Sequence, residues 1–148
     1  MTREMIVREM TEEDLVQVVE IEKEIFSQPW SKEGFLGSLK EKSTLYLCVE
    51  IDGKIAGYCG LLQVLDEADI TNVAVASEFR RQGIARQMLQ ELLRRGLGRG
   101  IKNFTLEVRE SNLSAQKLYE QLGFENFGII KNFYDFPKDN AVIMWKYF

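Results

Sequence analysis

The sequence predicts a mixed α/β (α+β) fold in which helices cover both faces of one central sheet. Three observations support this prediction. Strand-like and helix-like segments follow one another in the order β-α-α-β-β-β-α-β-α-β-β. An Asp52-Gly53 pair between two strand-like segments is typical of a tight hairpin turn. The length of 148 residues suits a single domain, residues 1–148, with a hydrophobic core of its own.

The first three elements are a strand and two helices. Residues 4–9 have the character of a strand, and Thr11 and Asp14 have the spacing of a capping box that begins a helix. Pro29 ends that helix, and Ser31 caps a second one. Their apolar positions recur at helical spacing and are Leu15, Val18, Val19, Ile25 and Phe26, then Phe35, Leu36 and Leu39.

The remaining elements alternate between strands and helices. A helix after Gly83 carries an apolar stripe, and a second helix begins at its cap Asn112 and ends at Gly123. We expect strands over residues 45–51, 54–64, 68–75, 101–108, 124–130 and 141–147, and helices over 83–99 and 112–122.

Composition excludes several classes of protein. The chain has no histidine, which rules out Ser-His and Cys-His catalysis and any His-ligated metal site, and we expect no metal. The net charge of −4 argues against general nucleic-acid binding. No apolar run approaches the ~20 residues of a membrane span, and residues 1–13 lack a signal core. We therefore expect a cytoplasmic protein without a membrane partner.

The two cysteines are expected to be buried, reduced thiols. A two-residue turn at Asp52-Gly53 would set Cys48 opposite Gly57. Cys59 would then lie diagonal to Cys48, roughly 7 Å away or more. That separation is too large for an unstrained disulfide.

One glycine-containing segment predicts an anion site. Residues 81–86 (Arg-Gln-Gly-Ile-Ala-Arg) follow a strand-like run and open a helix. A loop leading into a helix start gathers unpaired N–H groups that suit a phosphate or diphosphate, and Arg80, Arg81 and Arg86 add positive charge. The segment is neither a Walker loop nor a dinucleotide fingerprint. The alternative is a surface loop that is merely basic.

Glu107 and Tyr119 are the candidate chemical groups. Glu107 lies inside a strand between Leu106 and Val108, where a carboxylate is unusual unless it faces outward or serves as a base. Tyr119 lies seven residues after Asn112, on the same helix face. Either residue also has a structural interpretation: Glu107 as an outward polar residue and Tyr119 as a core aromatic.

Six segments, in this order and spacing, resemble the GCN5-related N-acetyltransferase (GNAT) superfamily over nearly the whole chain. They are residues 72–75 (Asn-Val-Ala-Val), 81–85 (Arg-Gln-Gly-Ile-Ala), 106–109 (Leu-Glu-Val-Arg), 111–112 (Ser-Asn), 118–120 (Leu-Tyr-Glu) and 122–124 (Leu-Gly-Phe). Residues 29–31, 65–68, 106–109 and 131–134 are similar to the ribosomal-protein-alanine N-acetyltransferases (RimI type) within it.

The resemblance implies direct transfer of an acetyl group from acetyl-CoA to the α-amino group of a protein N-terminus, with the N-terminal alanine of ribosomal protein S18 as the expected substrate. It implies that Glu107 is the base and Tyr119 the acid. The implied cofactor-binding residues are Val73, Ala74, Val75, Arg81, Gln82, Gly83, Ile84, Ala85, Arg86 and Asn112. Our candidates for the walls of the peptide site are Trp30, Asp66, Glu67 and Tyr134.

The chain departs from the family pattern at three positions. Ala85 replaces a common glycine in the loop, Phe133 a common tyrosine, and Asn140 a common aspartate. The last two lie near the expected peptide-binding loop, so they bear on substrate identity. Two alternatives remain: a small-molecule amine acetyltransferase on the same fold, and a non-catalytic acetyl-CoA-binding module.

Overall fold

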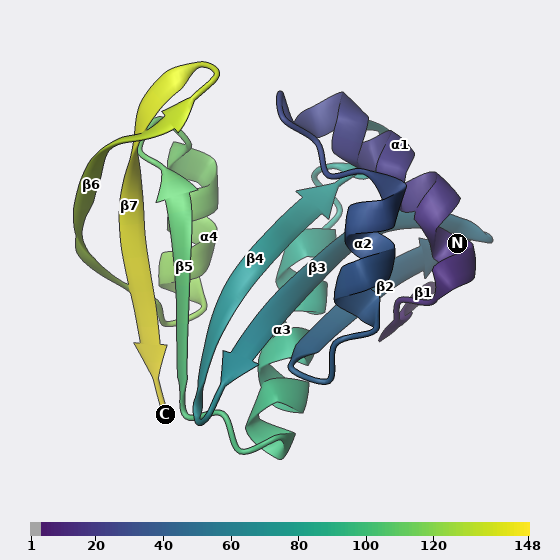
Figure 1. The fold of residues 1–148 in the computed structure, drawn as a ribbon, viewed down its shortest axis with the longest axis horizontal. Helices are drawn as coiled ribbons and strands as arrows, with labels where there is room; N and C mark the ends of the chain where they lie inside the picture. Colours follow the sequence, from purple (N-terminus) through teal and green to yellow (C-terminus); the bar gives the residue numbers. More distant parts are fainter. Residues whose placement is uncertain (1–3) are drawn as a thin grey trace.

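The computed structural model describes residues 4–148 and folds them around one seven-stranded sheet (Figure 1). The order of strands and helices is the predicted one. The elements are β1 (Met5–Glu9), α1 (Leu15–Ile25), α2 (Lys32–Leu39), β2 (Thr44–Ile51), β3 (Lys54–Val64), β4 (Glu67–Val75), α3 (Ile84–Gly98), β5 (Asn103–Arg109), α4 (Leu113–Gln121), β6 (Glu125–Asp135) and β7 (Lys138–Tyr147). Short 3-10 turns, Glu12–Asp14 and Ser77–Phe79, precede α1 and α3.

The sheet has the order β1-β2-β3-β4-β5-β7-β6, and β4 and β5 are its parallel pair. Helices α1 and α2 cover one face and α3 and α4 the other, which confirms the predicted layers (Figure 1). The β4–β5 pairing covers only Glu67–Asp69 and Asn103–Thr105. Beyond it the two strands diverge, as Figure 1 shows, and one edge of β4 is left without a strand partner.

The predicted caps form where the sequence places them. The Thr11 N–H donates to Asp14 Oδ2 over 2.7 Å. The Gly34 N–H donates to Ser31 Oγ over 3.1 Å, and the Ala115 N–H donates to Asn112 Oδ1 over 3.2 Å. Because each cap satisfies an N–H that its helix leaves unpaired, these side chains fix the first residues of the helical segments.

The core lies on both sides of β3. Residues 55–61 of that strand are all buried, because helices cover both faces of the sheet there. Helix α3 contributes the buried stripe Ile84, Met88, Leu89, Leu92 and Leu93, as its periodicity predicts. A Cβ on Gly96 would lie 2.7 Å from the ring of Phe104, so this glycine allows α3 to pack closely on β5.

The predicted register of the β2–β3 hairpin is wrong by one residue. Cys48 pairs with Tyr58 rather than Gly57, because a bulge after Val49 adds a residue to β3. Cys48 and Cys59 therefore point to opposite faces of the sheet. Both are free and buried, which confirms the prediction of reduced thiols, and burial raises the pKa of each.

The last hairpin is longer than the sequence predicts. Strand β6 continues to Asp135 and β7 begins at Lys138, and Tyr134 pairs with Asp139. Residues 131–133 of the expected peptide-binding loop have no β7 partner, because the register shifts between Ile130 and Tyr134. The turn is the Phe136-Pro137 pair. Asn140 Oδ1 accepts a hydrogen bond from the Asn132 N–H over 2.9 Å, a role that an aspartate would also fill.

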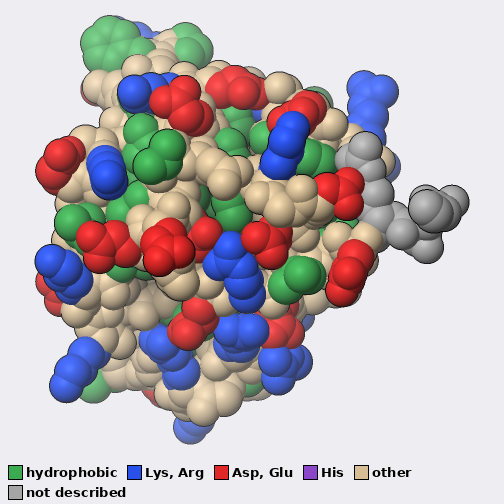
Figure 2. Space-filling view, turned by 90° about the vertical axis from the view of Figure 1, so that its right-hand side faces the viewer, with side chains coloured by type: hydrophobic (Ala, Val, Ile, Leu, Met, Phe, Trp, Pro, Cys, Tyr) green, Lys and Arg blue, Asp and Glu red, His purple; other side chains and the backbone are tan. Residues whose placement is uncertain are grey.

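Charge on the surface is mixed. Figure 2 shows the side of the molecule that carries α1 and β1, where acidic side chains lie among Lys and Arg side chains and scattered apolar ones. Such a mixture of charges is typical of a solvated surface. Within residues 4–148, no helix has both the length and the apolar character needed to cross a membrane.

Candidate active site

A pocket of about 830 Å³ lies where β4 and β5 diverge. The divergence matters because a continuous sheet would fill this space with backbone. Every layer of the fold contributes to the lining, which includes Ile25, Phe26, Ser27, Gln28, Thr71, Val73, Ala74, Val75, Phe79, Arg80, Arg81, Gly83, Ile84, Ala85, Arg86, Glu107, Val108, Arg109, Asn112, Ser114, Ala115, Leu118, Tyr119, Tyr134, Phe136 and Pro137.

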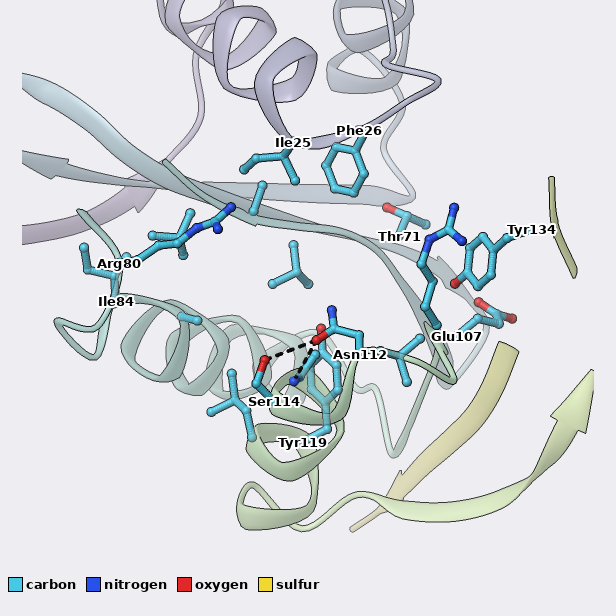
Figure 3. Close-up of a pocket in the computed structure, with 18 of the residues that line it drawn as sticks. Ile25, Phe26, Thr71, Arg80, Ile84, Glu107, Asn112, Ser114, Tyr119 and Tyr134 are labelled. Atoms are coloured by element: carbon cyan, nitrogen blue, oxygen red, sulfur yellow. Dashed lines mark hydrogen bonds between the residues drawn. The ribbon is translucent and has the colours of Figure 1, made fainter. Parts of the chain in front are cut away.

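The pocket has two chemically different ends. Figure 3 shows Arg80 and Ile84 at one end and Glu107 and Tyr134 at the other. Phe26 lies on one side of the space between them, and Tyr119 lies on the opposite side (Figure 3). An elongated ligand with an anionic end could therefore reach from the arginines to the carboxylate.

The arginine end is built from the turn before α3. Gly83 has φ 74° and Arg81 has φ 63°, left-handed conformations that turn the chain sharply into the helix. The first helical bond from this turn is Gln87 N–H to Gly83 O, 3.2 Å, so the preceding N–H groups have no acceptor inside the helix. A Cβ on Gly83 would meet nothing within 4 Å, which leaves the approach to these N–H groups open.

This end suits a phosphate or diphosphate. Arg80, Arg81 and Arg86 surround the start of α3, and the helix dipole adds partial positive charge there. The Arg86 side chain also donates a hydrogen bond to Gln121 Oε1, which links α3 to α4. Gln82 belongs to the same loop but does not line the pocket, so of the predicted cofactor residues it is the one that the structure leaves outside.

The free edge of β4 runs along the middle of the pocket. Val73, Ala74 and Val75 line the pocket and pair with β3 on their other side. Since β5 has already diverged, the backbone groups on this edge face the pocket. Asn112, which caps α4, also lines the pocket (Figure 3).

Glu107 lies on the face of β5 opposite to its core side chains. Phe104, Leu106 and Val108 are buried, whereas Glu107 is half-buried and lines the pocket. From the sequence alone, Glu107 could also have been a polar residue that faces solvent. The structure places this carboxylate at the pocket, beside Tyr134 (Figure 3).

Tyr119 is both a core aromatic and a pocket wall. Its side chain is 7% exposed, and its ring packs edge-on against Phe124 at 5.9 Å. Burial is the main cause of a raised pKa for its hydroxyl, which stays protonated at neutral pH. The hydroxyl is therefore available as a hydrogen-bond and proton donor.

Three segments far apart in sequence close the carboxylate end. Ser27, which follows α1, donates a hydrogen bond to the carbonyl of Phe136 in the β6–β7 turn. Arg109 of β5 donates to the Pro137 carbonyl over 2.8 Å, and its guanidinium lies 4.2 Å from the ring centre of Tyr134. Sequence reasoning missed Ser27, Arg109 and the turn, because no local pattern marks residues that meet only in the fold.

Three of the four predicted peptide walls are not at the pocket. Asp66 lies in the β3–β4 turn and Glu67 begins β4, where that strand still pairs with β5. A strand advances about 3.3 Å per residue, so they lie about 20 Å from Val73–Val75. Trp30 is 39% exposed and lines a separate shallow groove beside α2. Tyr134 is the predicted wall that does line the pocket.

Charged groups elsewhere do not suggest a metal site. Within the part of the chain that the structure describes, no three Cys, Asp or Glu side chains gather in a way that could hold a metal ion. The pocket itself offers the Glu107 carboxylate, the phenols of Tyr119 and Tyr134, backbone N–H groups and arginines.

Comparison with known proteins agrees with this geometry. Residues 15–124 match the model of the Acetyltransferase (GNAT) family. The chain is 39% identical over 146 residues to a "[Ribosomal protein bS18]-alanine N-acetyltransferase" of Haemophilus ducreyi, covering 96% of this chain and 99% of that protein. It is 37% identical over 133 residues to the protein of the same name from Salmonella typhimurium, covering 88% and 89%.

The fold agrees as well. The crystal structure of the ribosomal-protein-S18-alanine N-acetyltransferase from Escherichia coli superimposes with a TM-score of 0.90 and 32% identity, covering 97% of this chain and 94% of that one. A family model spanning most of the chain, relatives of similar length and a matching fold lead to one conclusion. This chain belongs to the GNAT family of acetyltransferases, whose acetyl donor is acetyl-CoA.

Proposed function

We propose that this protein transfers an acetyl group from acetyl-CoA to the α-amino group of a protein N-terminus, and that its substrate is the N-terminal alanine of ribosomal protein S18. The observation that carries the proposal is the pocket itself. It joins an anion-binding end at α3 to a carboxylate end at Glu107 through the gap between β4 and β5. The names of relatives at 37% and 39% identity supply the identity of the substrate.

The residues around α3 fit the donor. The open approach at Gly83 and the arginines at the helix start suit the diphosphate of acetyl-CoA. The free edge of β4 at Val73–Val75 offers backbone N–H groups to the extended part of the ligand and to the carbonyl oxygen that becomes negatively charged. Asn112 forms part of the pocket wall.

Acetyl-CoA supplies a thioester that an amine can attack directly. Glu107 takes the proton that the amine nitrogen loses as the new N–C bond forms. The Tyr119 hydroxyl gives its proton to the sulfur as the C–S bond breaks. A protein α-amine has a pKa near about 8, so part of it is neutral at pH 7 and a modest base is sufficient. Both cysteines are buried in strands, which leaves no thiol placed to form a covalent acetyl-enzyme.

The experiment is an acetyl-CoA assay over matched peptides, with mass spectrometry locating the acetyl group. The panel contains an S18 N-terminal peptide beginning with alanine, the same peptide beginning with methionine, the same peptide already Nα-acetylated but carrying an internal lysine, and spermidine. We expect acetylation of the alanine α-amine only. Transfer mainly to lysine or to spermidine would contradict the proposal and favour a different amine substrate.

A further inference from the structure

Asp69 lies at the point where β4 and β5 begin to diverge. It pairs with Thr105 in the last step of the parallel ladder before the strands diverge. Its Oδ1 atom is buried, and within residues 4–148 no hydrogen-bond donor reaches it. An unpaired buried carboxylate oxygen costs about 1–3 kcal/mol or more, so native structures rarely retain one without a role.

Asp69 faces the same side of the sheet as Glu107. Paired residues of neighbouring strands point to the same face, and alternate residues along one strand do so too. Asp69 pairs with Thr105, and Glu107 follows Thr105 by two residues. The two carboxylates therefore lie on adjacent strands, on the face of the sheet that carries the carboxylate end of the pocket. Asp69 does not line the pocket, and Glu107 does.

The surroundings set Asp69 apart from an ordinary surface carboxylate. Burial, and secondly the charge of Glu107, raise the pKa of Asp69 to about 6. Its strand neighbours Leu62 on β3 and Thr105 on β5 are uncharged, as is Trp145 beyond them on β7. The other charged or titratable side chains on this face include Glu67 two residues before Asp69 and the exposed Glu125 and Tyr147 near Trp145. Arg109, Tyr134 and Asp139 lie farther along the sheet.

We propose that Asp69 and Glu107 form a carboxylate pair that carries the substrate proton, with Glu107 contacting the amine and Asp69 acting through Glu107 as a positioning residue. The inference rests on the proposed function. The amine N–H bond breaks, an O–H bond forms on Glu107, and that proton is then shared with Asp69 Oδ1 in a hydrogen bond. It leaves to water when the acetylated product departs. Only a proton moves, so no further reactant is needed.

The pair explains why the unpaired oxygen is retained. Oδ1 of Asp69 has no donor in the resting protein because its donor is the proton that the reaction delivers. A group that titrates near pH 6 is better matched to proton uptake at neutral pH than an unperturbed aspartate. Neighbouring carboxylates that differ in proton affinity are typical of acid-base sites.

The kinetic test is the ratio of kcat/KM between the wild type and Asp69→Asn, measured from pH 5 to pH 9 with the alanine peptide. The amide keeps the shape of the side chain and cannot accept the proton. We expect the ratio to rise from about one below pH 5 to about tenfold above pH 7, with a midpoint near 6. Above pH 8 the ratio should decrease again, because the amine then loses its proton unaided and needs the base less. Glu125→Gln, an exposed charge change on β6, is the control and should leave the ratio at one.

The second readout does not depend on any peptide. Carbon NMR of labelled aspartate carboxyls, recorded as a function of pH, gives the titration midpoint of the Asp69 carboxyl in the wild type and in Glu107→Gln. We expect a titration midpoint near 6 in the wild type and a lower one in Glu107→Gln. The midpoint should stay above that of an ordinary aspartate in the variant, because burial is the larger cause of the raised pKa. A ratio that is constant with pH, or an Asp69 midpoint below 5, would overturn the inference. If the wild type acetylates no peptide N-terminus, the proposed function fails, and the NMR titration alone decides the role of Asp69.

Discussion

The two ends of the pocket are built in different ways. The arginine end comes from one short stretch, residues 80–86, in which a left-handed turn leads into α3. The carboxylate end is assembled from Ser27, Glu107, Arg109 and Tyr134, which belong to three separate segments. The first end is a local backbone feature, and the second exists only after the sheet has formed. Sequence patterns can therefore reveal the arginine end but not the carboxylate end. Because the two ends share no segment, variants can test acetyl-CoA binding and amine recognition separately.

The largest effect is expected for Tyr119→Phe, which acts where both ends meet. Only a hydroxyl is removed and the ring keeps its contact with Phe124, so folding should not change. Loss of a general acid lowers kcat about 10²–10⁴-fold. Calorimetry should show unchanged acetyl-CoA affinity. Tyr147→Phe, on an exposed tyrosine of β7, is the control. A decrease in kcat of less than about threefold would leave Tyr119 as a core aromatic only.

Glu107→Gln should have the next largest effect, and that effect should be limited to the carboxylate end of the pocket. We expect kcat/KM to fall about 10²-fold at pH 7, with acetyl-CoA affinity unchanged. The loss should be greatest at low pH, where the amine is mainly charged and needs the base most, and smaller above pH 8, where the amine loses its proton unaided. Steady-state kinetics across this pH range provides the measurement. An equal loss at every pH would indicate that Glu107 only positions the amine.

Gly83→Ala should affect the arginine end alone. Its new Cβ would enter the open space beside the start of α3, and we expect acetyl-CoA affinity to fall about tenfold, or about 1.4 kcal/mol. Gly53→Ala is a matched control, because Gly53 in the β2–β3 turn has φ 78° and also has open space around its Cβ position. Both variants carry the same backbone strain of about 1 kcal/mol. Equal acetyl-CoA affinities for the two variants would remove Gly83 from the binding site.

Ser27→Ala should have a smaller effect than Gly83→Ala and should affect peptide binding rather than acetyl-CoA binding. It removes the hydrogen bond from the α1–α2 segment to the Phe136 carbonyl, which is an ordinary bond of about 1 kcal/mol. We expect the KM for the peptide to rise about fivefold, while the Kd for acetyl-CoA stays the same. If both constants change together, the two ends of the pocket are coupled more tightly than their construction indicates.

Asp14→Asn should leave turnover unchanged and affect stability only, which contrasts a structural carboxylate with Glu107. The Arg8 guanidinium beside Asp14, with two 2.8 Å bonds, lowers the pKa of that carboxyl to about 2. A lowered folded-state pKa stabilises the protein above the unfolded pKa of about 4, and this stability is lost as the pH falls toward 2. We expect the free energy of unfolding to fall by about 1–2 kcal/mol at pH 7. This is less than the full pKa shift implies, because solvent screens the part-exposed Arg8. Urea unfolding at pH 7 and pH 3 should show the difference between wild type and variant shrinking at the lower pH.

Prediction from sequence succeeded where chemistry and position are local. The caps Thr11, Ser31 and Asn112, the stripe of α3 and the order of strands all follow from spacing along a few turns. Asp66 and Glu67, which the resemblance made candidates for the peptide site, do not line the pocket, because the pocket opens only where β4 has diverged from β5. The register of β2 and β3 failed because a bulge leaves no local signature.

The amino-acid sequence by itself determined the elements, their order and the arginine-rich turn at Gly83 that leads into α3. Helix caps, periodicity and left-handed turns depend on residues within a few positions of one another. The tertiary structure alone decided that β4 and β5 diverge after Asp69, that Ser27 reaches the Phe136 carbonyl, and that the Asp69 carboxylate shares a face with Glu107. Pairing between strands and contacts between distant loops depend on how the whole sheet closes over its helices, which no single segment encodes.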